Sequence, residues 1–124
     1  MRQAAHIQID CSITVRNILC EALRNYASYA LADSHSARSL MSRLALMRVV
    51  KSIESQRHNR FNPLQIRREL HNQCIQAINH HYDRIEKQLK TPVSEQRRLM
   101  ISLLNGHSVL DHDLDAAIYK DNLI

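Results

Sequence analysis

The chain has 124 residues, with one Gly, two Pro, no Trp and 4% aromatic residues. All-β folds need Gly and Pro for their many turns, so this composition argues against that class. The apolar fraction of 44% argues against wholesale disorder, and the formal net charge of +5 favours an acidic partner. We expect a single helical domain that spans residues 1–124.

The first predicted helix covers residues 11–32. Asp10 or Ser12 can cap it, because their side-chain oxygens accept hydrogen bonds from the free N–H groups of the first turn. Tyr26 and Tyr29 fit the core with their hydroxyls at the rim, and an interface with another molecule is the alternative. One face of this helix is an apolar stripe at spacings of three and four: Val15, Ile18, Ala22, Tyr26 and Tyr29.

The second predicted helix covers residues 37–57 and is apolar over most of its circumference. A helix of this kind usually lies at the centre of a bundle, so we expect it to be the best buried of all. Its Lys and Arg side chains would reach water through their long aliphatic stems. Its apolar residues are Leu40, Met41, Leu44, Ala45, Leu46, Met47, Val49, Val50 and Ile53.

The third predicted helix begins at Pro63 and ends near residue 90. Asn62 is a good N-cap, Pro63 fits the first helical position, and Gln65 can reach back as in a capping box. The expected inner face consists of Ile66, Leu70, Cys74, Ala77, Ile78, His81, Ile85 and Leu89.

Two shorter helices follow in the C-terminal third. Thr91-Pro92 starts the fourth helix, and Asn105-Gly106 ends it. In the fifth helix, Asp111 and Asp113 lie in the first turns, where the helix dipole favours negative charge. The sequence therefore predicts an all-α fold, a compact bundle of four to five helices of which three are long and two C-terminal ones are short.

Basic residues are concentrated around the connection between the second and third predicted helices. Eight Lys or Arg residues and one acid, Glu54, lie between Arg38 and Arg68. The two helix ends would meet at one tip, called here the basic tip. It could bind an acidic protein surface or phosphates, or be only a solvated hairpin end. The candidate binding residues of the basic tip are Arg48, Lys51, Arg57, His58, Arg60, Phe61, Arg67 and Arg68.

Motifs for catalysis or metal binding are weak. The chain lacks a P-loop, a GxGxxG motif and an HExxH motif. His71 and Cys74 lie one helical turn apart, but a closed zinc site needs four ligands, and His81 lies about 15 Å farther along a helix. We therefore expect no metal, no cofactor and no enzymatic activity. One catalytic alternative stays open, in which His58 or His71 beside Arg67 and Arg68 acts as an acid–base pair in RNA cleavage.

Cysteine usage and the absence of long apolar runs bear on localisation. Cys11, Cys20 and Cys74 are odd in number and lack a CxxC spacing, which favours buried thiols in a reducing cytosol. No apolar run has the length of a signal peptide or a membrane span. We expect a cytoplasmic protein, with export to a host by a non-classical signal as the alternative.

The leading hypothesis is a small regulatory or adaptor protein, bacterial or from a mobile element. It would bind a protein partner with an acidic surface through the basic tip. The first alternative is a regulator that binds nucleic acid through the same residues, and the second is a His-dependent, ribonuclease-like activity. The surplus of apolar residues in the second predicted helix also suggests a homodimer, whose interface could include Tyr26 and Tyr29.

Overall fold

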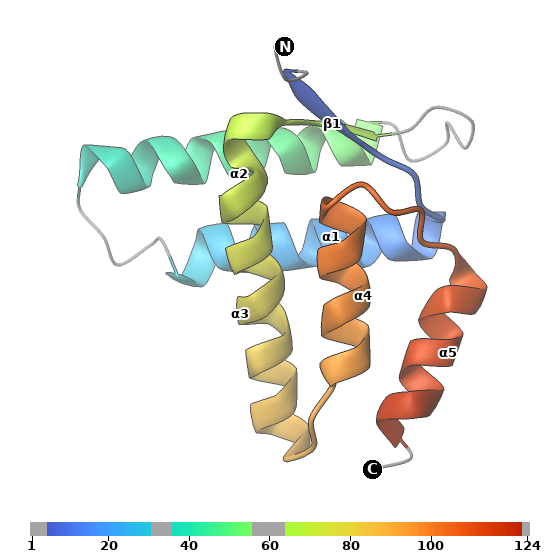
Figure 1. Ribbon diagram of the computed structural model, residues 1–124. Helices are drawn as coiled ribbons and strands as arrows, with labels where there is room; N and C mark the ends of the chain where they lie inside the picture. The colour runs from blue at the N-terminus through green and yellow to red at the C-terminus, as the bar shows by residue number, and fades with distance from the viewer. Residues whose placement is uncertain (1–4, 31–35, 56–63, 123–124) are drawn as a thin grey trace.

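The computed structural model describes residues 5–30, 36–55 and 64–122. Within these ranges the chain forms five α-helices and a small two-stranded sheet, so the prediction of an all-α bundle of four to five helices is confirmed. Figure 1 shows the arrangement. The elements in chain order are β1 (His6–Ile9), α1 (Ile13–Asn25), the π-helical turn η1 (Tyr26–Ala30), α2 (Ala37–Ser55), β2 (Leu64–Arg67), the 3₁₀ turn η2 (Arg68–Leu70), α3 (His71–Leu89), α4 (Ser94–Leu104) and α5 (Asp111–Asn122).

The central helix is α1, which packs against α2, α3 and α5 and runs behind α3 and α4 in Figure 1. It begins as predicted, because the Oγ atom of Ser12 accepts a hydrogen bond of 3.3 Å from the N–H of Val15. Val15, Leu19 and Leu23 expose no surface. Ala22 and Ala27 are also fully buried, and their small side chains let neighbouring elements approach closely.

The expectation that the second helix would be the best buried is wrong. α2 buries only Leu46, Val50 and Ile53, which follow one another at spacings of four and three and form a single inner face. A helix that is apolar all round needs partners on every side. Within the described part of the chain, α2 finds its neighbours on one side, chiefly α1 and η1.

The sheet corrects the predicted start of the third helix. Residues 64–67 form strand β2, which pairs antiparallel with β1 so that Ile7 lies opposite Ile66 and Ile9 opposite Leu64. Leu64 and Ile66 are buried while Gln65 is exposed, which is the alternation of a half-buried strand. α3 begins only at His71.

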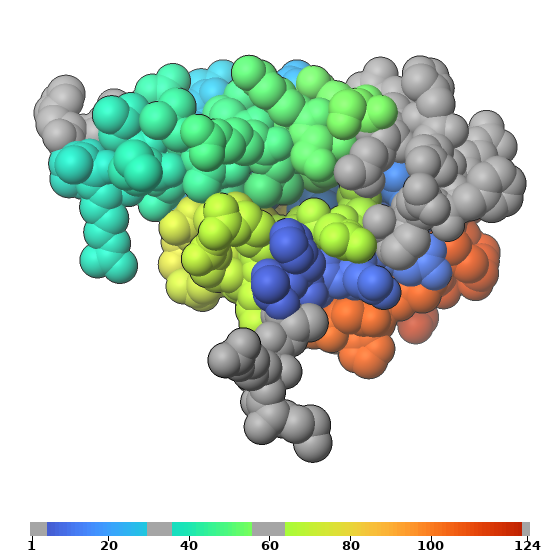
Figure 2. Space-filling model, turned by 90° about the horizontal axis from the view of Figure 1, so that it is seen from above, coloured from blue at the N-terminus to red at the C-terminus, as the bar shows by residue number. Residues whose placement is uncertain are grey.

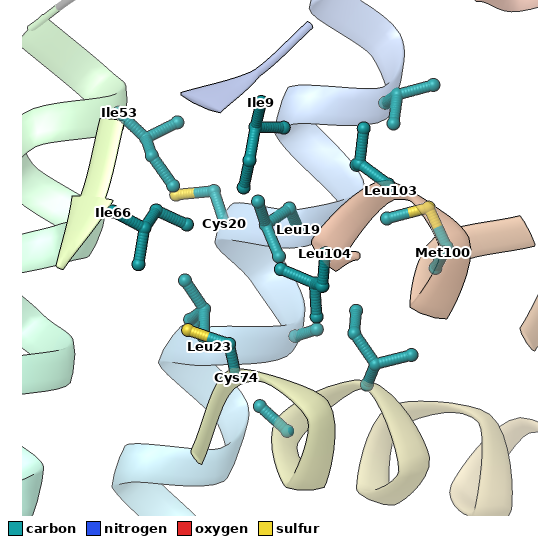
Figure 3. Close-up of a cluster of buried hydrophobic side chains, with 14 of the residues drawn as sticks. Ile9, Leu19, Cys20, Leu23, Ile53, Ile66, Cys74, Met100, Leu103 and Leu104 are labelled. Carbon is teal, nitrogen blue, oxygen red and sulfur yellow. The ribbon is translucent and has the colours of Figure 1, made fainter. Parts of the chain in front are cut away.

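The hydrophobic core joins side chains from both strands and all five helices, as the close-up in Figure 3 shows for its central part. Ile9 of β1 and Ile66 of β2 lie against α1 there. Met100 and Leu103 of α4 reach the same cluster. The two strands therefore extend the bundle core rather than forming a separate layer.

An unusual cap fastens α5 to α4. Val93, the residue before α4, offers no side-chain cap. Asp121 of α5 supplies one, because its Oδ1 accepts from the N–H of Glu95 at 2.9 Å and its Oδ2 from the N–H of Gln96 at 3.0 Å. The side-chain Nε2 of Gln96 donates a third bond of 3.0 Å to Oδ2. A carboxylate at this point satisfies free N–H groups and is favoured by the dipole of α4.

The predicted end of α4 at Asn105-Gly106 is confirmed. The N–H of Gly106 donates to Leu103 O and the N–H of His107 donates to Ser102 O, both at 3.1 Å, so the last carbonyls of the helix are satisfied. Gly106 has a φ of 99°, in the left-handed region that favours glycine.

We expect Gly106→Ala to lower the free energy of unfolding by about 1 kcal/mol, because a β-carbon is strained at this φ. No atom lies within 4 Å of the position that the β-carbon would take, so the cost comes from the backbone and not from a clash. Urea denaturation of both proteins measures it. The control is His107→Ser at the exposed neighbouring residue. An equally large loss of unfolding free energy in His107→Ser would contradict our assignment of the Gly106→Ala effect to the φ angle of residue 106.

Candidate functional site

Half of the predicted basic tip falls within the described residues. Arg48 and Lys51 are exposed on α2, and Arg67 and Arg68 are exposed on β2 and η2. Because β2 and η2 precede α3, the tip is not the junction of two helices that the sequence predicted. The remaining predicted residues, Arg57, His58, Arg60 and Phe61, lie outside the described ranges.

The most prominent exposed feature is the side of α2 that faces away from the core. Leu40, Met41 and Leu44 are exposed to 54%, 67% and 49%. Helical periodicity places Arg48 and Lys51 on the same side, one and two turns farther along. We call these five residues the α2 outer face. Figure 2 shows α2, in teal to green, open to view along its length.

The exposed surface of α2, on and beside the α2 outer face, is strongly cationic. From Ala37 to Ile53 the helix carries Arg38, Arg43, Arg48 and Lys51 and no acidic residue. Glu54, the one acid of α2, forms an ion pair with Arg24 of α1 and so does not offset this charge. The basic residues of α2 are exposed as the sequence predicted, whereas Leu40, Met41 and Leu44, which were predicted to be buried, are exposed as well.

The two tyrosines predicted as core or interface residues have different environments. Tyr26 is half-buried against α3, where its hydroxyl donates to Gln76 Oε1 at 2.7 Å and its ring meets the ring of His80 edge to face. Tyr29 is 61% exposed, and the guanidinium of Arg84 lies 4.9 Å from its ring centroid. Tyr26 is therefore partly buried with its hydroxyl at the rim of the core, and Tyr29 lies on the surface beside a cation.

The residues of the catalytic alternative are partly separated. His58 lies outside the described residues. Arg67 forms an ion pair with Glu69, whereas Arg68 and His71 line one groove together with His6 of β1. His81, expected as a core histidine, is half-buried beside Tyr82, and burial lowers the pKa of its imidazole.

The three cysteines are buried and form no disulfide, as predicted. Burial raises the pKa of the Cys11 thiol to about 11 and that of the Cys74 thiol to about 12. Both thiols are therefore protonated at neutral pH and are poor nucleophiles.

In residues 5–30, 36–55 and 64–122, no three His, Cys, Asp or Glu side chains come together in a way that could hold a metal ion. None of the helices in these ranges combines the length and the hydropathy that a membrane span requires.

Comparisons with known proteins do not extend this picture. No protein-family model matches the chain. No curated protein and no solved structure matches it either.

Proposed function

We propose that this chain is a small regulatory or adaptor protein that binds an acidic protein partner through the α2 outer face. The observation that carries the proposal is a surface helix with a second apolar stripe. Leu40, Met41 and Leu44 are neighbouring, solvent-exposed side chains, although α2 already has a buried inner face. Adjoining exposed apolar side chains on a soluble domain typically mark a binding surface.

The surrounding charge indicates the chemistry of the partner. Arg38 and Arg43 flank the apolar residues, and Arg48 and Lys51 continue the same face. A partner helix with an apolar stripe edged by Asp or Glu complements this pattern, since opposite charges steer the encounter and fix its register. Covering the exposed parts of the three apolar side chains would contribute about 1 kcal/mol each.

The mixture of apolar and basic side chains on the α2 outer face favours a protein partner over a nucleic acid. Phosphate backbones are held by cations and polar groups, and an exposed Leu-Met-Leu cluster contributes nothing to such contacts. An interface core with Arg at its border is typical of protein partners.

The proposal is tested with a synthetic amphipathic helix that carries Leu on one face and Glu on its flanks. The same peptide with Lys in place of Glu is the charge control, and fluorescence anisotropy measures both affinities. We expect the acidic peptide to bind and the basic one not to bind. Replacing Leu40, Met41 and Leu44 by Ser should weaken binding by about tenfold or more. Leu89→Ser, at a 62% exposed leucine at the end of α3, should leave binding unchanged.

Other outcomes would overturn the proposal in distinct ways. Equal binding of both peptides, or unchanged binding after the triple replacement, would remove the α2 outer face as the site. Binding of arbitrary DNA or RNA that falls with salt and is lost in Arg48→Glu with Lys51→Glu would replace the protein partner by nucleic acid. Concentration-dependent self-association lost in the triple variant would make the occupant a second copy, since α5 itself exposes Ile118 and Tyr119 beside Asp115.

A further inference from the structure

A second candidate site lies away from α2, where β1 passes the start of α3 and the end of α4. The groove has a volume of about 450 Å³, the size of a small-ligand site. We call it the His6 groove. The polar residues and the glycine that line it are His6, Gln8, Arg68, His71, Asn105 and Gly106.

Pairing of the two strands brings the groove together. His6 lies opposite Arg67 in the sheet, and the N–H of Arg68 donates to Ala5 O at 2.9 Å. These contacts hold the start of β1 against η2. Because residues three apart in a 3₁₀ turn lie on the same side, Arg68 and His71 both reach the groove.

The opposite wall comes from the end of α4. The Nε2 atom of His71 lies 3.0 Å from Asn105 Oδ1, and since an amide oxygen only accepts, Nε2 carries the proton. This bond fixes the imidazole ring at the first residue of α3. Gly106 has no side chain, so the backbone of the α4 end is open to a ligand.

The formal charge of the lining is positive and comes from Arg68. Its guanidinium lines the groove beside the imidazoles of His6 and His71, and the described residues that line the groove include no Asp or Glu. The positive end of the α3 dipole begins at His71. The carbonyls of the last α4 turn are already bonded to the N–H groups of Gly106 and His107, so they repel an anion less.

From this convergence we infer that the His6 groove binds the phosphate group of a phosphate ester, with a mononucleotide as the ligand that its volume fits. Phosphate oxygens accept two N–H bonds from the guanidinium of Arg68 and a further bond from the imidazole of His6. The inference is independent of the proposed function, because none of these residues belongs to the α2 outer face.

NMR titration of the full chain with inorganic phosphate and with adenosine monophosphate tests the inference. We expect chemical-shift changes for the amides of β1, η2 and the end of α4, with millimolar or tighter affinity. Arg68→Gln should weaken binding by about tenfold. The matched control is Arg67→Gln at the neighbouring residue, whose side chain pairs with Glu69 and does not line the groove.

Each remaining result decides the question. Absence of shift changes at millimolar phosphate and nucleotide, or equal weakening by Arg67→Gln and Arg68→Gln, would overturn the inference. A single-stranded oligonucleotide that binds far more tightly than the mononucleotide, and depends on Arg68 but not Arg67, would support the phosphate site and identify a polymer as its source. His6→Gln on the exposed strand β1 provides a second variant if Arg68→Gln does not fold, with the same expected weakening.

Discussion

Asp121→Ala should lower the free energy of unfolding by about 3 kcal/mol, the largest effect of a single replacement that we expect. Asp121 is 1% exposed, and its carboxylate accepts all three bonds that cap α4. The replacement leaves two backbone N–H groups of α4 without an acceptor and loosens α5. Thermal unfolding followed by circular dichroism should show a Tm lower by about 10 °C.

Two variants on the same helix make this prediction specific. Asp115→Ala removes an exposed carboxylate from α5 and should change the free energy of unfolding by less than about 0.5 kcal/mol. Asp121→Asn keeps one oxygen acceptor and should fall between Asp121→Ala and the unaltered protein. A loss below about 1 kcal/mol in Asp121→Ala would show that water replaces the cap.

Stability should also fall steeply between pH 9 and 12. Burial raises the pKa of Cys74 from 9.0 to about 12 and that of Tyr82 from 10.0 to about 12. Above pH 9 the unfolded chain loses these protons first, so the unfolded state binds fewer protons than the folded state and the free energy of unfolding decreases as pH rises. Each group contributes about 1.4 kcal/mol per pH unit between its unfolded and folded pKa values.

Urea denaturation at pH 8 and pH 10 measures this loss. Cys74→Ala should reduce the pH-dependent loss, although the variant is less stable at both pH values. Ala77→Gly, at another fully buried residue of α3, should lower stability equally at both pH values because it removes no ionisable group. An unchanged pH dependence in Cys74→Ala would contradict the role of this thiol.

The sequence predicted the helices best where the local signals agreed with the tertiary structure. Ser12 caps α1, Asn105-Gly106 ends α4, and the three cysteines are buried. Around residues 64–67 the local cap signals favoured a helix. Pairing with β1 outweighed them, because Leu64 and Ile66 can enter the core only on alternate positions of a strand.

The features that the sequence did not predict depend on contacts between segments that are distant in the chain. Asp121 lies in the last turn of α5, where that helix's own dipole disfavours a negative charge, and only the start of α4 explains it. The apolar residues of α2 gave no indication of which side would find a partner. The His6 groove combines β1, η2, α3 and α4, so no local motif could have indicated it.

The pairing of β1 with β2 has a consequence for synthesis on the ribosome. β1 is synthesised before its partner β2, and Cys11 is synthesised long before Val109, to which it bridges in the segment before α5. Asp10 and Ser108, which are joined by a hydrogen bond, are separated by 98 positions in the chain. At about 5–20 residues per second the ribosome needs several seconds to deliver the later segments. During that time α1 lacks α3 and α5, so part of its apolar face is available to chaperones and the native core closes late in translation.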